Sequence, residues 1–121
     1  MSAKSELLDI FDEFGYPYWL MHTMPARQKY PESFFTFLVA DAPFEAHYDN
    51  QPHSVVWYFE IGFYSSDPAL VASVPLELTK RLRAAGWSVP GLGSDAQSDE
   101  PTHTGWHFSA LCVQPINHEE V

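Results

Sequence analysis

SVVWYFEIGFYSSDP, residues 54–68, is the stretch that decides the fold of this chain. Successive residues of a strand point to opposite faces of the sheet. One face of the expected strand, about residues 54–64, is apolar and carries Trp57, Phe59, Ile61 and Phe63. The other face mixes apolar side chains with one carboxylate and carries Val56, Tyr58, Glu60, Gly62 and Tyr64. A strand with one wet face alternates apolar with polar residues, so this run raises the question of what covers its second face.

The length and composition indicate one folded domain over residues 1–121. A hydrophobic fraction of 45% makes wholesale disorder improbable. No apolar run approaches the roughly 18 residues of a membrane-spanning helix, and carboxylates interrupt the apolar N-terminal stretch, unlike a secretory signal. The single Cys112 permits no internal disulfide. We therefore expect a soluble, intracellular protein with a flexible tail at about 114–121.

The charge argues against sequence-specific DNA binding. Sixteen Asp and Glu against six Lys and Arg give a net charge of −10, and such a surface repels phosphate. The basic cluster of Lys80, Arg81 and Arg83 falls near the end of an expected helix, where the helix dipole favours cations. An acidic surface that lets DNA slide past without sticking remains compatible with this balance.

Two amphipathic helices flank the strands. The first is expected over residues 2–14, where apolar residues recur at helical spacing and Gly15 follows. The second begins at Asp67-Pro68, a helix cap followed by proline, and Gly86 closes it. Pro75 lies inside this second pattern, so we expect either a kink or a main helix that restarts after Ser73.

Strands are expected at residues 34–39 and 106–113, with a short extended segment at 18–22. Residues 40–53 read as a long connection, and residues 91–105 as a mobile polar loop. This order predicts an α+β fold: one mostly antiparallel sheet of about four strands, with two helices packed against it, in the order α-β-β-(β)-α-β.

No motif supports catalysis. His103 and His107 have metal-chelating spacing only on a helix, and in a strand they stand about 13 Å apart. The acidic loop lacks the spacing of a calcium site. Cys112 lies on an aromatic strand face and is interpreted as an inert buried thiol. We therefore expect no enzyme activity, no catalytic residues, no metal and no cofactor.

The order of sequence blocks matches a known family of assembly proteins. A first helix precedes PESFFTFLVAD and YDNQPHS, and then come FEIGFYSSDP, KRLRAAGW, an acidic loop and GWHFSALCV. Over residues 3–113 the chain resembles the small tail terminator, or tail-to-head joining, proteins of long-tailed bacteriophages and prophages. The most telling part is residues 48–87, and Pro75 is a departure from the pattern.

The resemblance implies a homo-hexameric ring that ends tail-tube polymerisation and joins the tail to the head. Its partners would be further copies of the chain, the tail-tube protein and a head-completion or connector protein, with DNA passing through the channel. The location would be the virion tail, assembled in the host bacterial cytoplasm, with no membrane contact. The implied contact residues are Tyr48, Asp49, Asn50, Tyr58, Glu60, Tyr64, Asp95, Asp99 and Glu100. Helices would then cover one face of the 54–64 strand, and a neighbouring subunit part of the other.

Three alternatives stay open. One is another phage neck or minor tail protein of similar design. A second is a small-ligand binding domain or enzyme with Trp57, Tyr58 and Trp106 as pocket walls. The third is a bacterial adaptor that dimerises through an exposed strand edge. The mass in solution separates rings from monomers and dimers.

Overall fold

The computed structural model describes residues 2–21, 23, 30–48 and 51–115. Within them lie two helices, α1 (Ala3–Phe14) and α2 (Pro68–Ala84). The strands are β1 (Tyr18–Leu20), β2 (Ser33–Asp41), β3 (Phe44–Tyr48), β4 (Gln51–Ser65), β5 (Ser94–Ala96) and β6 (Thr104–Pro115).

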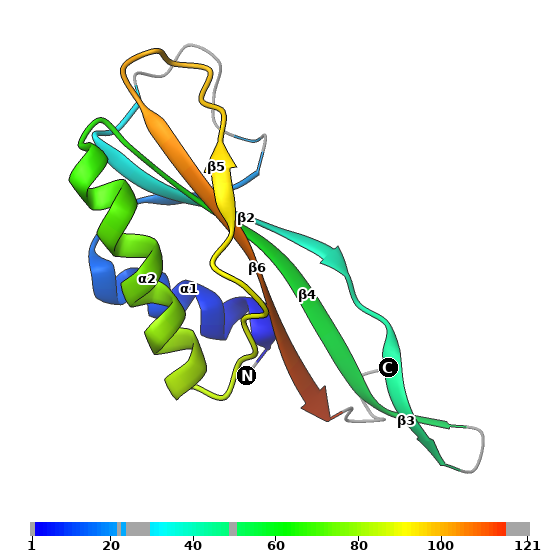
Figure 1. The fold of residues 1–121 in the computed structure, drawn as a ribbon. Helices are drawn as coiled ribbons and strands as arrows, with labels where there is room; N and C mark the ends of the chain where they lie inside the picture. The colour runs from blue at the N-terminus through cyan, green and yellow to red at the C-terminus, as the bar shows by residue number, and fades with distance from the viewer. Residues whose placement is uncertain (1, 22, 24–29, 49–50, 116–121) are drawn as a thin grey trace.

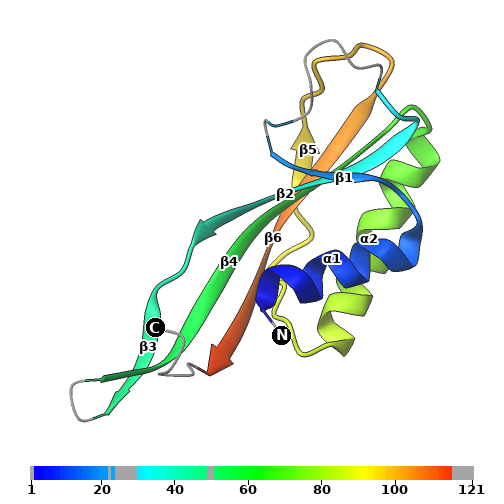
Figure 2. The ribbon, with the colours of Figure 1, turned by 180° about the vertical axis from the view of Figure 1, so that it is seen from behind.

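The strands form one mixed sheet with β4 at its centre. The order across the sheet is β1-β2-β4-β6-β5, and β3 continues beyond β2 along the same side of β4. Only the β1–β2 pair is parallel. Both helices pack on one face of the sheet, and β3, β4 and β6 run on past them as a long twisted arm (Figures 1 and 2). The expected α+β class, with one sheet and two helices, is confirmed.

The apolar face of β4 forms the centre of the core. Phe59, Ile61 and Phe63 are fully buried between the sheet and the helices. Phe11 of α1 stacks on Phe35 of β2, with ring centroids 4.5 Å apart and planes tilted by 6°. Each such buried side chain contributes about 1.5–3 kcal/mol through removal of apolar surface from water.

Local signals set the helix ends. The side chain of Ser2 accepts a hydrogen bond from the Ser5 backbone, and Gly15 ends α1 with a φ of 77°. The Asp67 side chain caps α2 by accepting from the Ala69 backbone. Helix α2 then runs unbroken through Pro75, so the expected restart after Ser73 is wrong.

Packing explains why α2 tolerates its proline. Pro75 removes one backbone donor from the helix. Val74 and Leu78 are buried in the core and Pro75 is buried beside them, and this burial offsets the missing hydrogen bond.

Two segments expected to be loops contain strands. Residues 40–53 were expected to be a long connection, but β2 reaches Asp41, a register shift follows Val39, and β3 then pairs with the first part of β4. The prolines at 43 and 52 are loop signals that edge pairing tolerates.

The second correction concerns residues 91–105, which contain β5. Gly93 has a φ of 100°, and a Cβ there would collide with the His107 carbonyl oxygen. Glycine therefore lets the chain approach β6 closely enough to pair with it. The sheet thus has more strands than the expected four, and β1 adds a parallel pair.

Candidate interaction surface

The sheet face opposite α1 and α2 is here called the open face. Both helices lie on the other side of the sheet, and none of the helices in the described part of the chain covers this one (Figures 1 and 2). The strand registers place even-numbered residues of β4 beside odd-numbered residues of β6 on this face. Three zones follow one another along it: an aromatic cluster, a polar row and an apolar patch.

The aromatic cluster consists of Trp19, Tyr30, Phe34, Tyr64 and His103. The rings of Phe34 and Tyr64 stack with centroids 5.3 Å apart, and Trp19 and Tyr30 meet Phe34 edge-on. His103 Nε2 lies 2.8 Å from the Pro31 carbonyl oxygen. Phe34 is buried, so the aromatic side chains at this end of the open face pack against one another.

The ring of Tyr64 packs within this cluster. Burial raises the pKa of its phenol above the ordinary value of 10.0, and nearby Tyr30 and Asp99 act in the same direction. A Cβ built on Gly105 would lie 2.5 Å from the Tyr64 ring, so the glycine makes room for it. Tyr64 is therefore partly packed within this cluster.

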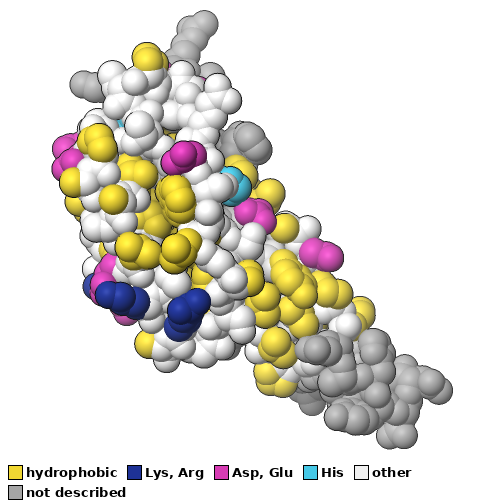
Figure 3. All heavy atoms as spheres, in the orientation of Figure 1, with side chains coloured by type: hydrophobic (Ala, Val, Ile, Leu, Met, Phe, Trp, Pro, Cys, Tyr) yellow, Lys and Arg dark blue, Asp and Glu magenta, His cyan; other side chains and the backbone are white. Residues whose placement is uncertain are grey.

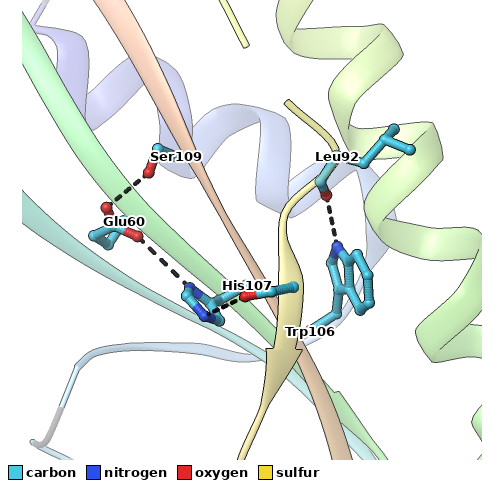
Figure 4. Close-up of polar contacts among 6 residues, drawn as sticks. Glu60, Leu92, Trp106, His107 and Ser109 are labelled. Carbon is cyan, nitrogen blue, oxygen red and sulfur yellow. Dashed lines mark hydrogen bonds and ion pairs between the residues drawn. The ribbon is translucent and has the colours of Figure 1, made fainter. Parts of the chain in front are cut away.

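The polar row joins Ser94, His107, Glu60 and Ser109 across β5, β6 and β4 (Figure 4). Ser109 Oγ donates to Glu60 Oε1 at 2.7 Å. Glu60 Oε2 lies 3.8 Å from His107 Nδ1, and the other ring nitrogen, Nε2, lies 2.9 Å from Ser94 Oγ. Serine, histidine and carboxylate thus stand in the order of a catalytic triad.

The geometry of this row differs from that of a working triad. The separation of 3.8 Å between Glu60 and His107 is too long for a hydrogen bond that would orient the ring. The two side chains are 35% and 44% exposed, so water screens both groups. The row is best described as a solvated polar band between the aromatic cluster and the apolar patch.

The apolar patch lies where the arm leaves the helices. Leu38, Tyr58 and Val113 point out from β2, β4 and β6 and are 37%, 39% and 52% exposed. Hydrophobic side chains gather along this part of the arm (Figure 3). Exposed apolar side chains that gather on three adjacent strands are typical of an interaction site.

The structure separates the predicted contact residues into three places. Tyr58, Glu60 and Tyr64 share the open face, one in each zone. Tyr48 ends β3 at the far end of the arm, and Asp49 and Asn50 lie outside the described residues. Asp95, Asp99 and Glu100 are exposed. They lie in and after β5, at the end of the sheet opposite the arm (Figure 1).

Sequence reasoning missed several residues of the open face. Leu38, Val113, Ser94 and Ser109 reach it only through the pairing of their strands with β4 and β6. The alternation within 106–113 was visible, but the register that sets Ser109 opposite Glu60 was not. His107 was considered only as a metal ligand together with His103, and the two rings have separate partners.

The proposed pocket walls do not meet in one pocket. Trp57 packs against the core on the helix side of β4, and its neighbour Tyr58 points to the open face. Trp106 Nε1 donates to the Leu92 carbonyl at 2.7 Å (Figure 4). Within the described ranges, no group of three or more His, Cys, Asp or Glu residues is placed to hold a metal ion.

No protein-family model matches the chain, and no curated protein matches it significantly. Neither α1 nor α2 is long and apolar enough to cross a membrane.

Proposed function

We propose that this protein is a structural subunit of the phage tail–head junction. In this proposal it assembles as a homo-hexameric ring on the tail tube, ends polymerisation of the tube and joins the tail to the head. Its partners are the tail-tube protein and a head-completion or connector protein, and it acts without a cofactor. A related role elsewhere in the phage neck or minor tail would use the same surfaces.

The apolar patch of Leu38, Tyr58 and Val113 is the observation that carries the proposal. A chain of 121 residues that functions alone would gain by placing polar residues at such positions. Contact with a second subunit removes these side chains from water, at about 25 cal/mol for each Å² of apolar surface buried. Assembly thus supplies the cover that the helices give only to the other face.

The charge of the chain supports the same role. A net charge of −10 is unsuited to tight binding of nucleic acid. A channel lined with such subunits repels phosphate and lets DNA pass without sticking. The most telling part of the resemblance, residues 48–87, contains β4, the central strand of the arm, and α2.

The mass in solution tests the proposal directly. Light scattering coupled to size exclusion, run from micromolar to millimolar protein, should find a species near six times 13.8 kDa. Electron microscopy of that species should show rings with an open centre. A protein that stays monomeric or dimeric over the whole range would overturn a ring that assembles without the tail tube.

A further inference from the structure

One side of the arm presents an unpaired strand edge at β3. On this side β1 pairs with β2 only as far as Phe37, and Met21 N–H donates to the Phe37 carbonyl at 2.8 Å. Farther along, β3 bonds to β4 on its inner side, and no strand in the described part of the chain lies on its outer side. The edge of Phe44–Tyr48 is therefore open.

One hydrogen bond shows which residues of β3 turn their backbone groups outward. Val56 N–H donates to the Pro43 carbonyl at 2.9 Å, so residues 43, 45 and 47 turn their backbone groups toward β4. The residues between them, at 44, 46 and 48, turn theirs outward. The register shift at Val39/Asp41 and Pro43 interrupt the edge before this point, but β3 itself lacks such protection.

The other side of the arm presents a second open edge, at the end of β6. Leu111 exchanges backbone hydrogen bonds with Ser88 at 2.8 and 2.9 Å on the side away from β4. By alternation, Val113 is the next residue whose N–H and C=O face outward. Among the described residues, no segment on the outer side of β6 forms a backbone hydrogen bond with Val113. Its side chain is 52% exposed.

We propose that the end of β6 in one subunit pairs with β3 in a second copy of the chain. The two open edges lie on opposite sides of the same three-stranded arm, with β4 between them (Figure 1). One copy can therefore offer β6 to the next while accepting a β6 from the previous one. This inference deepens the proposed function and depends on it, because it adds a backbone contact between neighbouring subunits to the covering of the apolar patch.

The topology also sets the direction of pairing. Strands β3 and β6 are both antiparallel to β4, so they run in the same direction. Arms that point the same way around a ring axis pair β6 with the next β3 in parallel. Such a head-to-tail contact uses two different surfaces and continues until rotation closes it. Closure leaves no open edge on β3 or on the end of β6, and paired edges are the state that folded sheets favour.

Two proline substitutions test this contact, one on each edge. Val113→Pro and Ala46→Pro each remove one outward N–H and leave the inner hydrogen bonds to β4 in place, as edge strands tolerate. Native Pro115 already occupies an outward position of β6, two residues after Val113. Each variant is expected to lose the ring and run at the mass of one subunit. The matched controls, Val113→Thr and Ala46→Ser, keep the N–H and should keep the ring.

A mixture of the two proline variants gives the sharpest readout. Val113→Pro retains a working β3 edge, and Ala46→Pro retains a working β6 edge. Mixed in equal amounts, they can form one contact and no second one, so the expected product is a heterodimer. Rings in either proline variant alone would overturn the edge pairing while leaving the proposed function intact. A wild-type chain that never assembles would overturn both.

Hydrogen exchange covers the case in which a proline variant fails to fold. In the wild-type ring, the amides of Val113 and Ala46 should exchange at least tenfold more slowly than in the monomer obtained by dilution. The amide of Leu111, bonded to Ser88 within one chain, should be protected in both states. Equal exchange of the Val113 and Ala46 amides in ring and monomer would refute the contact.

Discussion

Thr36 and Gly62 face each other across the β2–β4 ladder with no room for a side chain on Gly62. A Cβ built there would lie 2.5 Å from Thr36 Oγ1 and 3.1 Å from the ring of Tyr64. Thr36 Oγ1 is itself buried and has no hydrogen-bond partner in the structure described. The centre of the open face is thus tightly packed, even though neither helix covers it.

Replacing Gly62 by alanine should therefore destabilise the monomer. Overpacking of this kind costs about 1–3 kcal/mol of the free energy of unfolding. Urea unfolding of Gly62→Ala measures the loss. Gly91→Ala is the matched control, because nothing lies within 4 Å of a Cβ there.

The clash with Thr36 can be isolated in a double-mutant cycle. Thr36→Ala removes the hydroxyl that the new methyl group meets, so the double variant should recover much of the loss. If Gly62→Ala proved as stable as Gly91→Ala, the close approach of β2 and β4 would be refuted.

The predictable part of the fold depends on local patterns. The strand at 54–64 was expected from its alternation, and both helices from their caps and apolar stripes, since these signals lie within a few residues of one another. Strand β5 was missed because it is stabilised by pairing with β6, across the polar residues 97–103. Strand β3 forms a local hairpin with β4, but Pro43 and Pro52 on either side of it are loop signals. Gly91 and Gly93, just before β5, gave that segment the same appearance of a loop.

The open face was predictable only in part, for the same reason. Alternation placed Tyr58 and Glu60 on the face away from the helices, but it could not say which residues of other strands join them. Val113 and Ser109 are brought there by the β4–β6 register. The helix through Pro75 shows a further limit, because burial of its neighbours outweighs a local helix-breaking signal.

Cys112 should be unreactive in the folded protein. Burial, followed by the charge of Glu6, raises the pKa of its thiol above the ordinary value of 9.0. Since the thiolate is the reactive species, iodoacetamide at pH 8 should label the native protein at least tenfold more slowly than the urea-unfolded chain. Equal labelling rates would contradict the burial of this residue.

The same shift predicts a pH dependence of stability. A raised native pKa means that the folded state holds its proton more tightly, so this contribution is complete below about pH 9 and is lost as pH rises through the native pKa. The free energy of unfolding should therefore fall at alkaline pH more steeply in the wild type than in Cys112→Ser.

Ser94 should show no nucleophilic reactivity despite its place beside His107. The ring that would take its proton is 44% exposed, and the carboxylate behind it is 3.8 Å away. A fluorophosphonate probe is therefore expected to leave the protein unlabelled, as measured by mass spectrometry. Labelling that vanishes in both Ser94→Ala and His107→Ala would instead establish acyl-transfer chemistry in the polar row.

A charge at position 58 should separate assembly from folding. Tyr58 is 39% exposed in the single chain, so Tyr58→Glu should change the free energy of unfolding of the monomer by only about 0.5 kcal/mol. In the proposed ring the same carboxylate would be buried without a partner. The cost of several kcal/mol should raise the dissociation constant by at least about a hundredfold.

Leu76→Glu is the control, because Leu76 is similarly exposed, at 48%, but lies on α2, away from the open face. Light scattering across a dilution series, with thermal unfolding of each variant, measures both quantities. Equal loss of assembly in the two variants, or a loss of folding that matches the loss of assembly in Tyr58→Glu, would mean that the apolar patch is not the subunit contact.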